Sequence, residues 1–180
     1  MRAALSRRIL ALLERHTPEW VRRLEIRILM NLAAESFRRP RQSVAGLPAD
    51  EALRTYAAFT AASMAETEAD PRRLYDRAFR LGRRLRRLTG LKDPADLQRL
   101  VFWLYRNLGI TLQGCLPGKI TVPACYFSGF YSPAQCALMS HVDAGIISGL
   151  FGGGTLRFTE RLTEGRGRCR ACFGKEGESL

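Results

Sequence analysis

The sequence predicts an α+β fold: an N-terminal helical bundle of four to five helices, followed by a β-α-β-β unit with a small, mainly antiparallel sheet. Apolar residues recur every three or four positions through the first 109 residues, a spacing typical of amphipathic helices. The pattern becomes alternating in residues 119–128 and 155–164, as is typical of strands, and a helical segment lies between them. A Gly-containing turn then leads to a short third strand.

The change of pattern divides the chain into three parts. Residues 1–45 are predicted to form a basic amphipathic helical extension and residues 46–112 a helical part. Residues 113–180 form the β-α-β-β unit, which contains all five cysteines. We expect the second and third parts to fold as one compact domain, because a chain of 180 residues is long enough to bury a single core.

Capping signals predict the helix boundaries in the first half. Thr17 is expected to be an N-cap and Pro18 to begin the first turn of a restarted helix. Asp50 is expected to cap the next helix. Two further helices, within residues 70–90 and 93–109, each have Asp-Pro at the start and Gly at the end.

A formal net charge of +12, from 29 Lys and Arg against 17 Asp and Glu, favours anionic partners. The densest basic run, residues 80–88, has no interleaved aromatic residues and no recognition motif around it, so nucleic acid is not the expected partner. Its leucines, Leu81, Leu85 and Leu88, are expected to face the core. A peripheral anionic membrane or an acidic protein are the partners left open, and a GC-rich genome would produce the same arginine excess.

No targeting or membrane-spanning segment is expected. The longest apolar runs fall short of the roughly 18 residues that a transmembrane helix requires. Arg7, Arg8 and Glu14 interrupt the N-terminal apolar stretch, which argues against a secretory signal. The expected location is therefore cytoplasmic, and the odd number of cysteines agrees with free thiols in a reducing compartment.

The predicted helix over residues 132–151 carries the most informative side chain. Ser132, Pro133 and Gln135 have the spacing of a capping box with Pro in the first turn. Asp143 falls inside the apolar arc, where a buried carboxylate must find hydrogen bonds or a cation. It is either a structural group that caps backbone amides or an acid–base residue with a perturbed pKa. His141 lies on the opposite, solvent-facing side.

Cys169 and Cys172 belong to the third predicted strand, "RCRACF". Successive strand side chains point to opposite faces. Cys169 should therefore face inward with Phe173 while Cys172 faces outward, so the two thiols do not form a chelating pair.

Four side chains are expected to converge between the helix and the inner face of the sheet: Cys125, Cys136, Asp143 and Cys169. In the second strand, Glu160 and Glu164 share the mainly apolar face, near a cavity or the end of the sheet. Our ligand-binding candidates are Cys136, Glu160, Glu164 and Arg161. The alternative interpretation is that the thiols are small buried apolar groups.

Residues 125–173 resemble the C-terminal half of the L-2-amino-thiazoline-4-carboxylic acid hydrolase-like family. The positions that carry the resemblance are Cys125, Asp143, Gly165, Cys169 and Phe173. It implies a small-molecule enzyme that opens a C–N ring by hydrolysis. Asp143 would be the general base, and the thiolate of Cys125 or Cys169 the nucleophile.

The ending "CRACFG" is also similar to the C-terminal domain of plastid β-carotene isomerases, and "DRAF" at residues 76–79 to their helical part. This second resemblance implies iron as a cofactor, held by Cys125, Cys136 and Cys169, whereas the hydrolase-like interpretation needs no metal. A third likeness is to the 4-vinyl reductase-type small-molecule-binding domain.

Whether the chain is an enzyme stays open at this point. Neither His16 nor His141 is placed to serve as a base. A third interpretation is therefore a non-catalytic module that binds a small molecule or a metal, with basic helices that dock on an acidic partner or a membrane. The sequence does not identify a cofactor.

Overall fold

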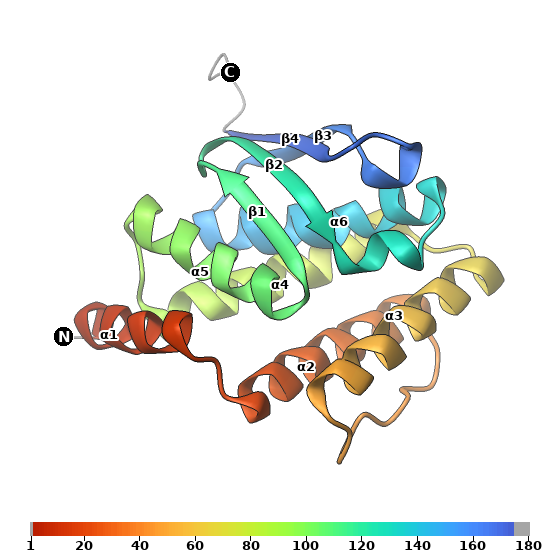
Figure 1. Cartoon of the computed structure of the whole chain (residues 1–180), viewed down its shortest axis with the longest axis horizontal. Coiled ribbons are helices and arrows are strands. Elements are labelled where there is room, and N and C mark those ends of the chain that lie inside the picture. The colour runs from red at the N-terminus through yellow and green to blue at the C-terminus, as the bar shows by residue number, and fades with distance from the viewer. Residues whose placement is uncertain (1, 175–180) are drawn as a thin grey trace.

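A computed structural model describes residues 2–174 and confirms the α+β prediction (Figure 1). Six α-helices, four strands and two 3-10 helices (η1 and η2) occur in the described part of the chain. Their bounds are α1 Arg2–Arg15, α2 Glu19–Phe37, α3 Ala49–Glu66, α4 Pro71–Thr89, α5 Pro94–Asn107, β1 Ile110–Gly114, β2 Gly118–Cys125, η1 Tyr126–Gly129, α6 Pro133–Phe151, β3 Thr155–Glu160, η2 Leu162–Glu164 and β4 Cys169–Gly174.

The sheet is antiparallel throughout, with strand order β1-β2-β4-β3. In Figure 1 it forms one layer of the molecule, with α4, α5 and α6 in the middle and α2 and α3 on the far side. β3 and β4 form the predicted hairpin. Strand β1 was not predicted: it is only five residues long and forms an antiparallel hairpin with β2, and its burial does not alternate regularly, so the local pattern gave little signal.

Alternation in β4 has the predicted consequence for the two nearby cysteines. Cys169 is buried opposite Val122 on the inner face of the sheet, together with Phe173. Cys172 lies opposite Lys119 and Arg157 on the outer face. All five cysteines are free thiols.

Three helices begin as their capping residues predict. The carboxylates of Asp70 and Asp93 accept hydrogen bonds from backbone N–H groups two residues further on, each at 2.9 Å. Ser132 begins α6 with the predicted capping box: its hydroxyl accepts from the Gln135 N–H at 3.3 Å, and the Gln135 side chain accepts in return at 2.9 Å.

Two predicted caps are wrong because tertiary partners take those side chains. The Thr17 hydroxyl donates to the Leu13 carbonyl at 2.9 Å and accepts from the Trp103 indole N–H at 2.9 Å, while Pro18 occupies the N-cap position of α2. Asp50 lies inside the first turn of α3, where its carboxylate pairs with Arg22 at 2.7 Å.

Helices α4 and α6 cross with their backbones in contact, and three glycines make this possible. A Cβ atom on Gly149 would lie 2.3 Å from the carbonyl oxygen of Phe79, and one on Gly82 would lie 2.3 Å from that of Ile146. A Cβ on Gly145 would meet the Tyr75 carbonyl at 2.5 Å. No ordinary side chain fits between these helices, so their separation is set by main-chain atoms.

This contact encloses α6 between α4 and the sheet. Residues 145–150 are buried on every side of the helix. Ser148, which the helical arc placed on the side opposite the apolar residues, is fully buried and donates to the Gly154 carbonyl at 2.6 Å. His141 lies near the middle of α6, before this fully buried segment, and is exposed as predicted.

The basic run of α4 is only partly as predicted. Leu81 and Leu85 are half-buried and pack against the core. Leu88, which was expected to face inward, is 67% exposed because the last turn of α4 extends beyond α6. No helix in residues 2–174 is long and apolar enough to cross a membrane.

We predict that Gly149→Ala lowers the free energy of unfolding by about 1–3 kcal/mol, because the added methyl group has to push two helix backbones apart. Urea denaturation of both proteins measures the difference. Gly129→Ala is the matched control, since nothing lies within 4 Å of its new Cβ. The control should stay within about 0.5 kcal/mol of the wild type, and equal effects of the two substitutions would contradict the close crossing.

Candidate functional site

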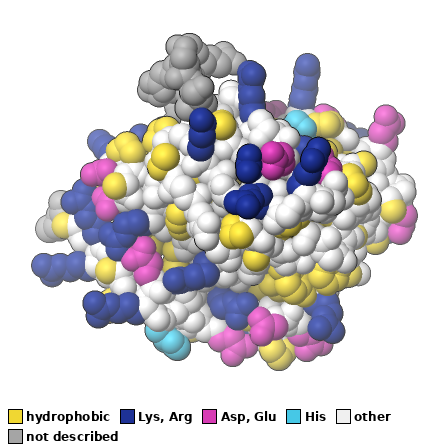
Figure 2. Space-filling view, turned by 45° about the horizontal axis from the view of Figure 1, so that its top comes forward, with side chains coloured by type: hydrophobic (Ala, Val, Ile, Leu, Met, Phe, Trp, Pro, Cys, Tyr) yellow, Lys and Arg dark blue, Asp and Glu magenta, His cyan; other side chains and the backbone are white. Residues whose placement is uncertain are grey.

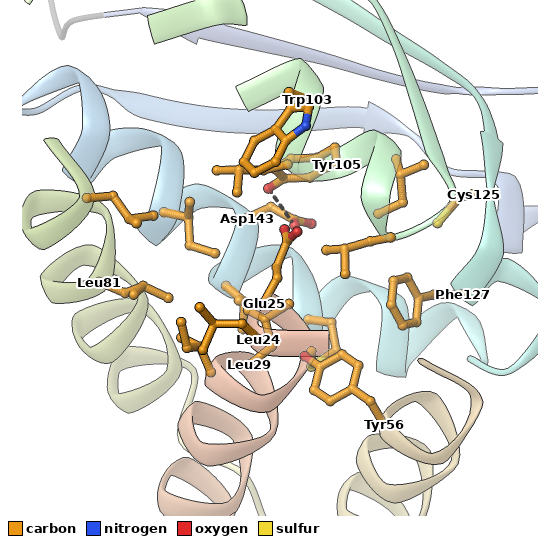
Figure 3. Close-up of a pocket in the computed structure, with 18 of the residues that line it drawn as sticks. Leu24, Glu25, Leu29, Tyr56, Leu81, Trp103, Tyr105, Cys125, Phe127 and Asp143 are labelled. Atoms are coloured by element: carbon orange, nitrogen blue, oxygen red, sulfur yellow. Dashed lines mark hydrogen bonds between the residues drawn. The ribbon is translucent and has the colours of Figure 1, made fainter. Parts of the chain in front are cut away.

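A cavity of about 260 Å³ lies between the α2–α3 pair and the layer formed by α4, α5 and α6 (Figure 3). It is lined by 21 residues, mostly Leu, Ile, Val and aromatic side chains. None of the lining residues is Lys, Arg or His, although the chain carries a net charge of +12. The ionisable acids of the lining are two carboxyl groups, those of Asp143 on α6 and Glu25 on α2.

Asp143 is held by a tyrosine on the facing helix. The Tyr105 hydroxyl of α5 donates to the Asp143 carboxylate at 2.8 Å. Burial raises the pKa of Asp143 from 3.8 to about 6, against the lowering effects of this hydrogen bond and of the Arg161 charge. Burial and the neighbouring carboxylate hold the pKa of Tyr105 well above its usual range, so the phenol keeps its proton and remains the donor.

Glu25 reaches the cavity from α2 and has a side-chain partner of its own. Its carboxylate accepts a hydrogen bond from the Asn107 amide at 3.0 Å. Burial raises its pKa from 4.5 to about 8, although the Asn107 hydrogen bond and the charge of Arg22 oppose the shift. At neutral pH Glu25 is therefore mostly a neutral acid, while Asp143 is mostly ionised.

Glu25 was not predicted as a site residue, although it has the same signal as Asp143, a carboxylate among apolar residues on one helix face. Glu25 lies four residues after Val21 and three before Ile28, on the apolar stripe of its helix. Tyr105 and Tyr56 carried no comparable signal, because a tyrosine on a buried helix face is ordinary core composition.

Tyr56 is a further polar side chain in the cavity wall. It is only 3% exposed. Figure 3 shows Tyr56 directed from α3 into the space that Glu25 enters from α2. Tyr131, another phenol of the wall, shares a hydrogen bond of 2.6 Å with the Thr60 hydroxyl. The Tyr56 phenol is a hydrogen-bonding group that a ligand in the cavity could contact.

The predicted convergence of thiols is partial. Cys125 and Cys136 line the cavity with Asp143. Cys169 does not line it, and its sulfur instead accepts a hydrogen bond from the Leu162 N–H at 3.3 Å. Burial raises the pKa of all three thiols, that of Cys125 to about 12, so each is protonated at neutral pH.

Three other predicted ligand-binding residues lie outside the cavity. Glu160 pairs with Arg170 at 3.4 Å at the end of the β3–β4 hairpin. Arg161 pairs with Glu164 at 3.4 Å, and its guanidinium lies 5.3 Å from the centre of the Phe158 ring. Arg161 acts on the cavity only at a distance, through its charge.

The side chains do not form a ready-made metal site. Within residues 2–174, no group of three or more His, Cys, Asp or Glu side chains is placed to hold a metal ion. Iron ligation by Cys125, Cys136 and Cys169 therefore finds no preformed site here.

Comparisons with known proteins place this fold only distantly. No family model matches the chain, and no curated protein sequence matches it. One solved structure similar to it is that of a vinyl-4-reductase family protein from Methanocaldococcus jannaschii, with a TM-score of 0.42 and 12% sequence identity. The match covers 83% of this chain and 90% of the other. A likeness this distant does not assign a family or an activity, so the function has to be inferred from the cavity itself.

The buried acid predicts a pH-dependent stability. Because the folded protein binds the Glu25 proton more tightly than the unfolded chain does, this contribution is complete below about pH 4.5 and is lost as the pH rises to about 8. Glu25→Gln removes it. We therefore expect the variant to match the wild type at low pH and to exceed it near pH 8 by a few kcal/mol, since each pKa unit corresponds to about 1.4 kcal/mol.

Denaturant unfolding across this pH range measures the difference, with the exposed Glu68→Gln as the matched control. The control should follow the wild type at every pH. A Glu25→Gln curve parallel to the wild type would contradict the burial of this carboxyl group.

The raised thiol pKa values predict slow alkylation. At neutral pH, iodoacetamide should modify the exposed Cys115 at least about 100 times faster than Cys125, because only thiolates react. Peptide mass spectrometry over a time course gives both rates within one sample. Equal rates would indicate an activated Cys125, as the hydrolase-like interpretation requires.

Proposed function

We propose that this chain is a small-molecule-binding protein whose cavity takes an apolar ligand with one basic, hydrogen-bond-donating end. The observation that supports this most strongly is the composition of the cavity wall. It is almost entirely apolar, and its ionisable groups are carboxylic acids, phenols and two thiols, without a single cationic side chain. A concave apolar space with a few convergent polar groups is the usual form of a small-molecule site.

The polar groups favour a cation or an amine over an anion. Asp143 is mostly ionised at neutral pH and has one hydrogen bond from Tyr105. No cationic residue lines the cavity, so a ligand ammonium group would supply the missing counter-charge at low dielectric. The neutral Glu25 carboxyl group and the Tyr56 hydroxyl add further hydrogen-bonding positions. A ligand carboxylate would instead face Asp143 without a cation between them.

The same chemistry favours binding over hydrolysis. Asp143 has a pKa suited to a general base. A thiolate nucleophile has no support, since burial keeps Cys125 protonated. The C–N hydrolase-like and the iron-dependent isomerase-like interpretations stay predictions, and the alkylation rate of Cys125 is the test of the first.

Volume limits the size of the ligand. The cavity, at about 260 Å³, is slightly smaller than the roughly 300–1,000 Å³ typical of small-molecule sites. A single flexible chain or a small ring system fits this space better than a multi-ring cofactor. Decylamine, decanol and decanoic acid are therefore suitable probes, because they share one chain and differ only in the polar end.

We predict that decylamine binds at least about ten times more tightly than decanoic acid at neutral pH, with decanol between them, because a charge-assisted hydrogen bond forms only with the amine. Displacement of the neutral fluorophore N-phenyl-1-naphthylamine measures all three. The overall charge of +12 favours the acid, so a preference for the amine has to come from the cavity.

Two variants separate the cavity from the surface. Asp143→Asn should remove most of the preference for the amine while leaving decanol binding unchanged. Val142→Phe, at a buried position in the wall, should reduce the binding of all three probes by filling the cavity. Tighter binding of decanoic acid by the wild type, or no effect of either variant, would refute the proposal.

A further inference from the structure

The large apolar side chains that are exposed in residues 2–174 gather on one part of the fold. Six of the seven lie on α1 and the first half of α2, and the seventh lies on the last turn of α4, next to the carbonyl of Thr89 that accepts a hydrogen bond from Ser6 of α1. They are Leu5, Ile9, Leu12, Trp20, Leu24, Ile28 and Leu88. The sheet side contributes none of them, and Figure 2, which brings that side forward, shows Lys and Arg scattered among other side chains there.

Helix α1 presents an apolar stripe to solvent while its other side is anchored. Leu5, Ile9 and Leu12, at i, i+4 and i+7, share one face and are 46–66% exposed. The opposite side buries Leu10, and Ser6 donates to the Thr89 carbonyl at 2.6 Å. The helix is thus held in place with its stripe outward.

Arginines accompany this stripe. Arg8 and Arg15 are exposed on α1. Arg8 directly precedes Ile9 in sequence, and Arg15 follows Leu12 by three residues. The acidic residues of the region are engaged elsewhere: Glu14 pairs with Arg99 at 2.6 Å, and Glu19 accepts a hydrogen bond from the Ala49 N–H at 3.2 Å. The stripe therefore lies in a locally positive surface.

On α2, a hollow lies beside the exposed indole. Trp20, Arg23, Leu24 and Arg27 line it together with the loop at residues 44–46. Trp20 is 61% exposed. Neither Arg23 nor Arg27 forms an ion pair with any residue in the described part of the chain, and the same holds for Arg8 and Arg15.

We propose that α1 and the first half of α2 dock on an anionic membrane surface, with Leu5, Ile9 and Leu12 among the acyl chains and the α2 hollow against lipid phosphate groups. A helix with an apolar face and flanking Arg is the form that lies in the membrane interface. Trp is enriched at that depth, and unpaired arginines gain about 1 kcal/mol each near an anionic leaflet. An acidic protein would satisfy the arginines but would leave the aliphatic stripe without a matching surface.

The docking surface is continuous with the cavity. Leu24 lines both the α2 hollow and the cavity, and Ile28 one turn later is a partly exposed member of the cavity wall. Docking through α2 therefore brings the opening of the cavity to the lipid, which is the source of an apolar ligand. This last step rests on the proposed function, whereas the docking itself does not.

Vesicle flotation with the full chain tests the docking. We expect binding to vesicles in which about a third of the lipid is phosphatidylglycerol, no binding to pure phosphatidylcholine vesicles, and loss of binding in high salt. The double variant Arg23→Glu/Arg27→Glu should weaken binding at least about tenfold. Arg157→Glu/Arg168→Glu makes the same change of net charge at two exposed positions on the sheet side and should stay within about twofold of the wild type.

The triple variant Leu5→Ser/Ile9→Ser/Leu12→Ser tests the apolar contribution. It should lose vesicle binding while its circular dichroism and thermal unfolding stay close to those of the wild type, since the substituted side chains are exposed. Three results would overturn the proposal: no binding of the wild type to anionic vesicles, equal loss in the sheet-side variant, or a wild-type dimer that the triple variant dissociates. Decylamine binding that persists without vesicle binding would show that the docking alone has failed.

Discussion

The close crossing of α4 and α6 is the constraint on which the rest of the structure depends. Gly82, Gly145 and Gly149 bring two main chains together without side chains between them. Helix α6 also packs against β3 of the sheet. The α4–α6 contact therefore fixes the position of Asp143 along and across α6 relative to Tyr105 on α5. Because main-chain atoms make this contact, no side-chain rotation can change the distance between the two helices. The position of the Asp143 carboxylate is therefore set by the backbone of α6.

Charge is distributed unevenly between the interior and the surface. The chain has 29 Lys and Arg against 17 Asp and Glu, and none of these basic residues lines the cavity. The cavity wall holds two carboxyl groups instead. Burial acts on those two groups to different extents, leaving Glu25 mostly neutral and Asp143 mostly ionised at neutral pH. The ligand charge that we propose for the interior is therefore opposite to the charge that the outer surface attracts.

Features determined by neighbours in sequence were predictable, and features determined by distant partners were not. The caps at Asp70, Asp93 and Ser132 and the inward position of Cys169 follow from local spacing alone. Thr17 and Asp50 had the right chemistry for caps, but Trp103 and Arg22 take their side chains. Strand β1 was missed for another reason: it is short and lacks regular alternation, although its partner β2 follows directly in sequence. The candidate cavity was half predictable: Asp143 and two of its thiols were among the candidates, while the opposite wall, from α2 and α3, lies at least 87 residues before Asp143 in sequence.

A wall made of touching backbones cannot widen when a side chain rotates, and this gives the cavity one rigid side and one adjustable side. The rigid side is α6, held against α4 by the three glycines. The adjustable side is α2, where Leu24 and Ile28 are partly in solvent and free to change rotamer. Over evolution, a change of ligand size is therefore expected to appear as substitutions along α2, with the glycines of the crossing left as they are.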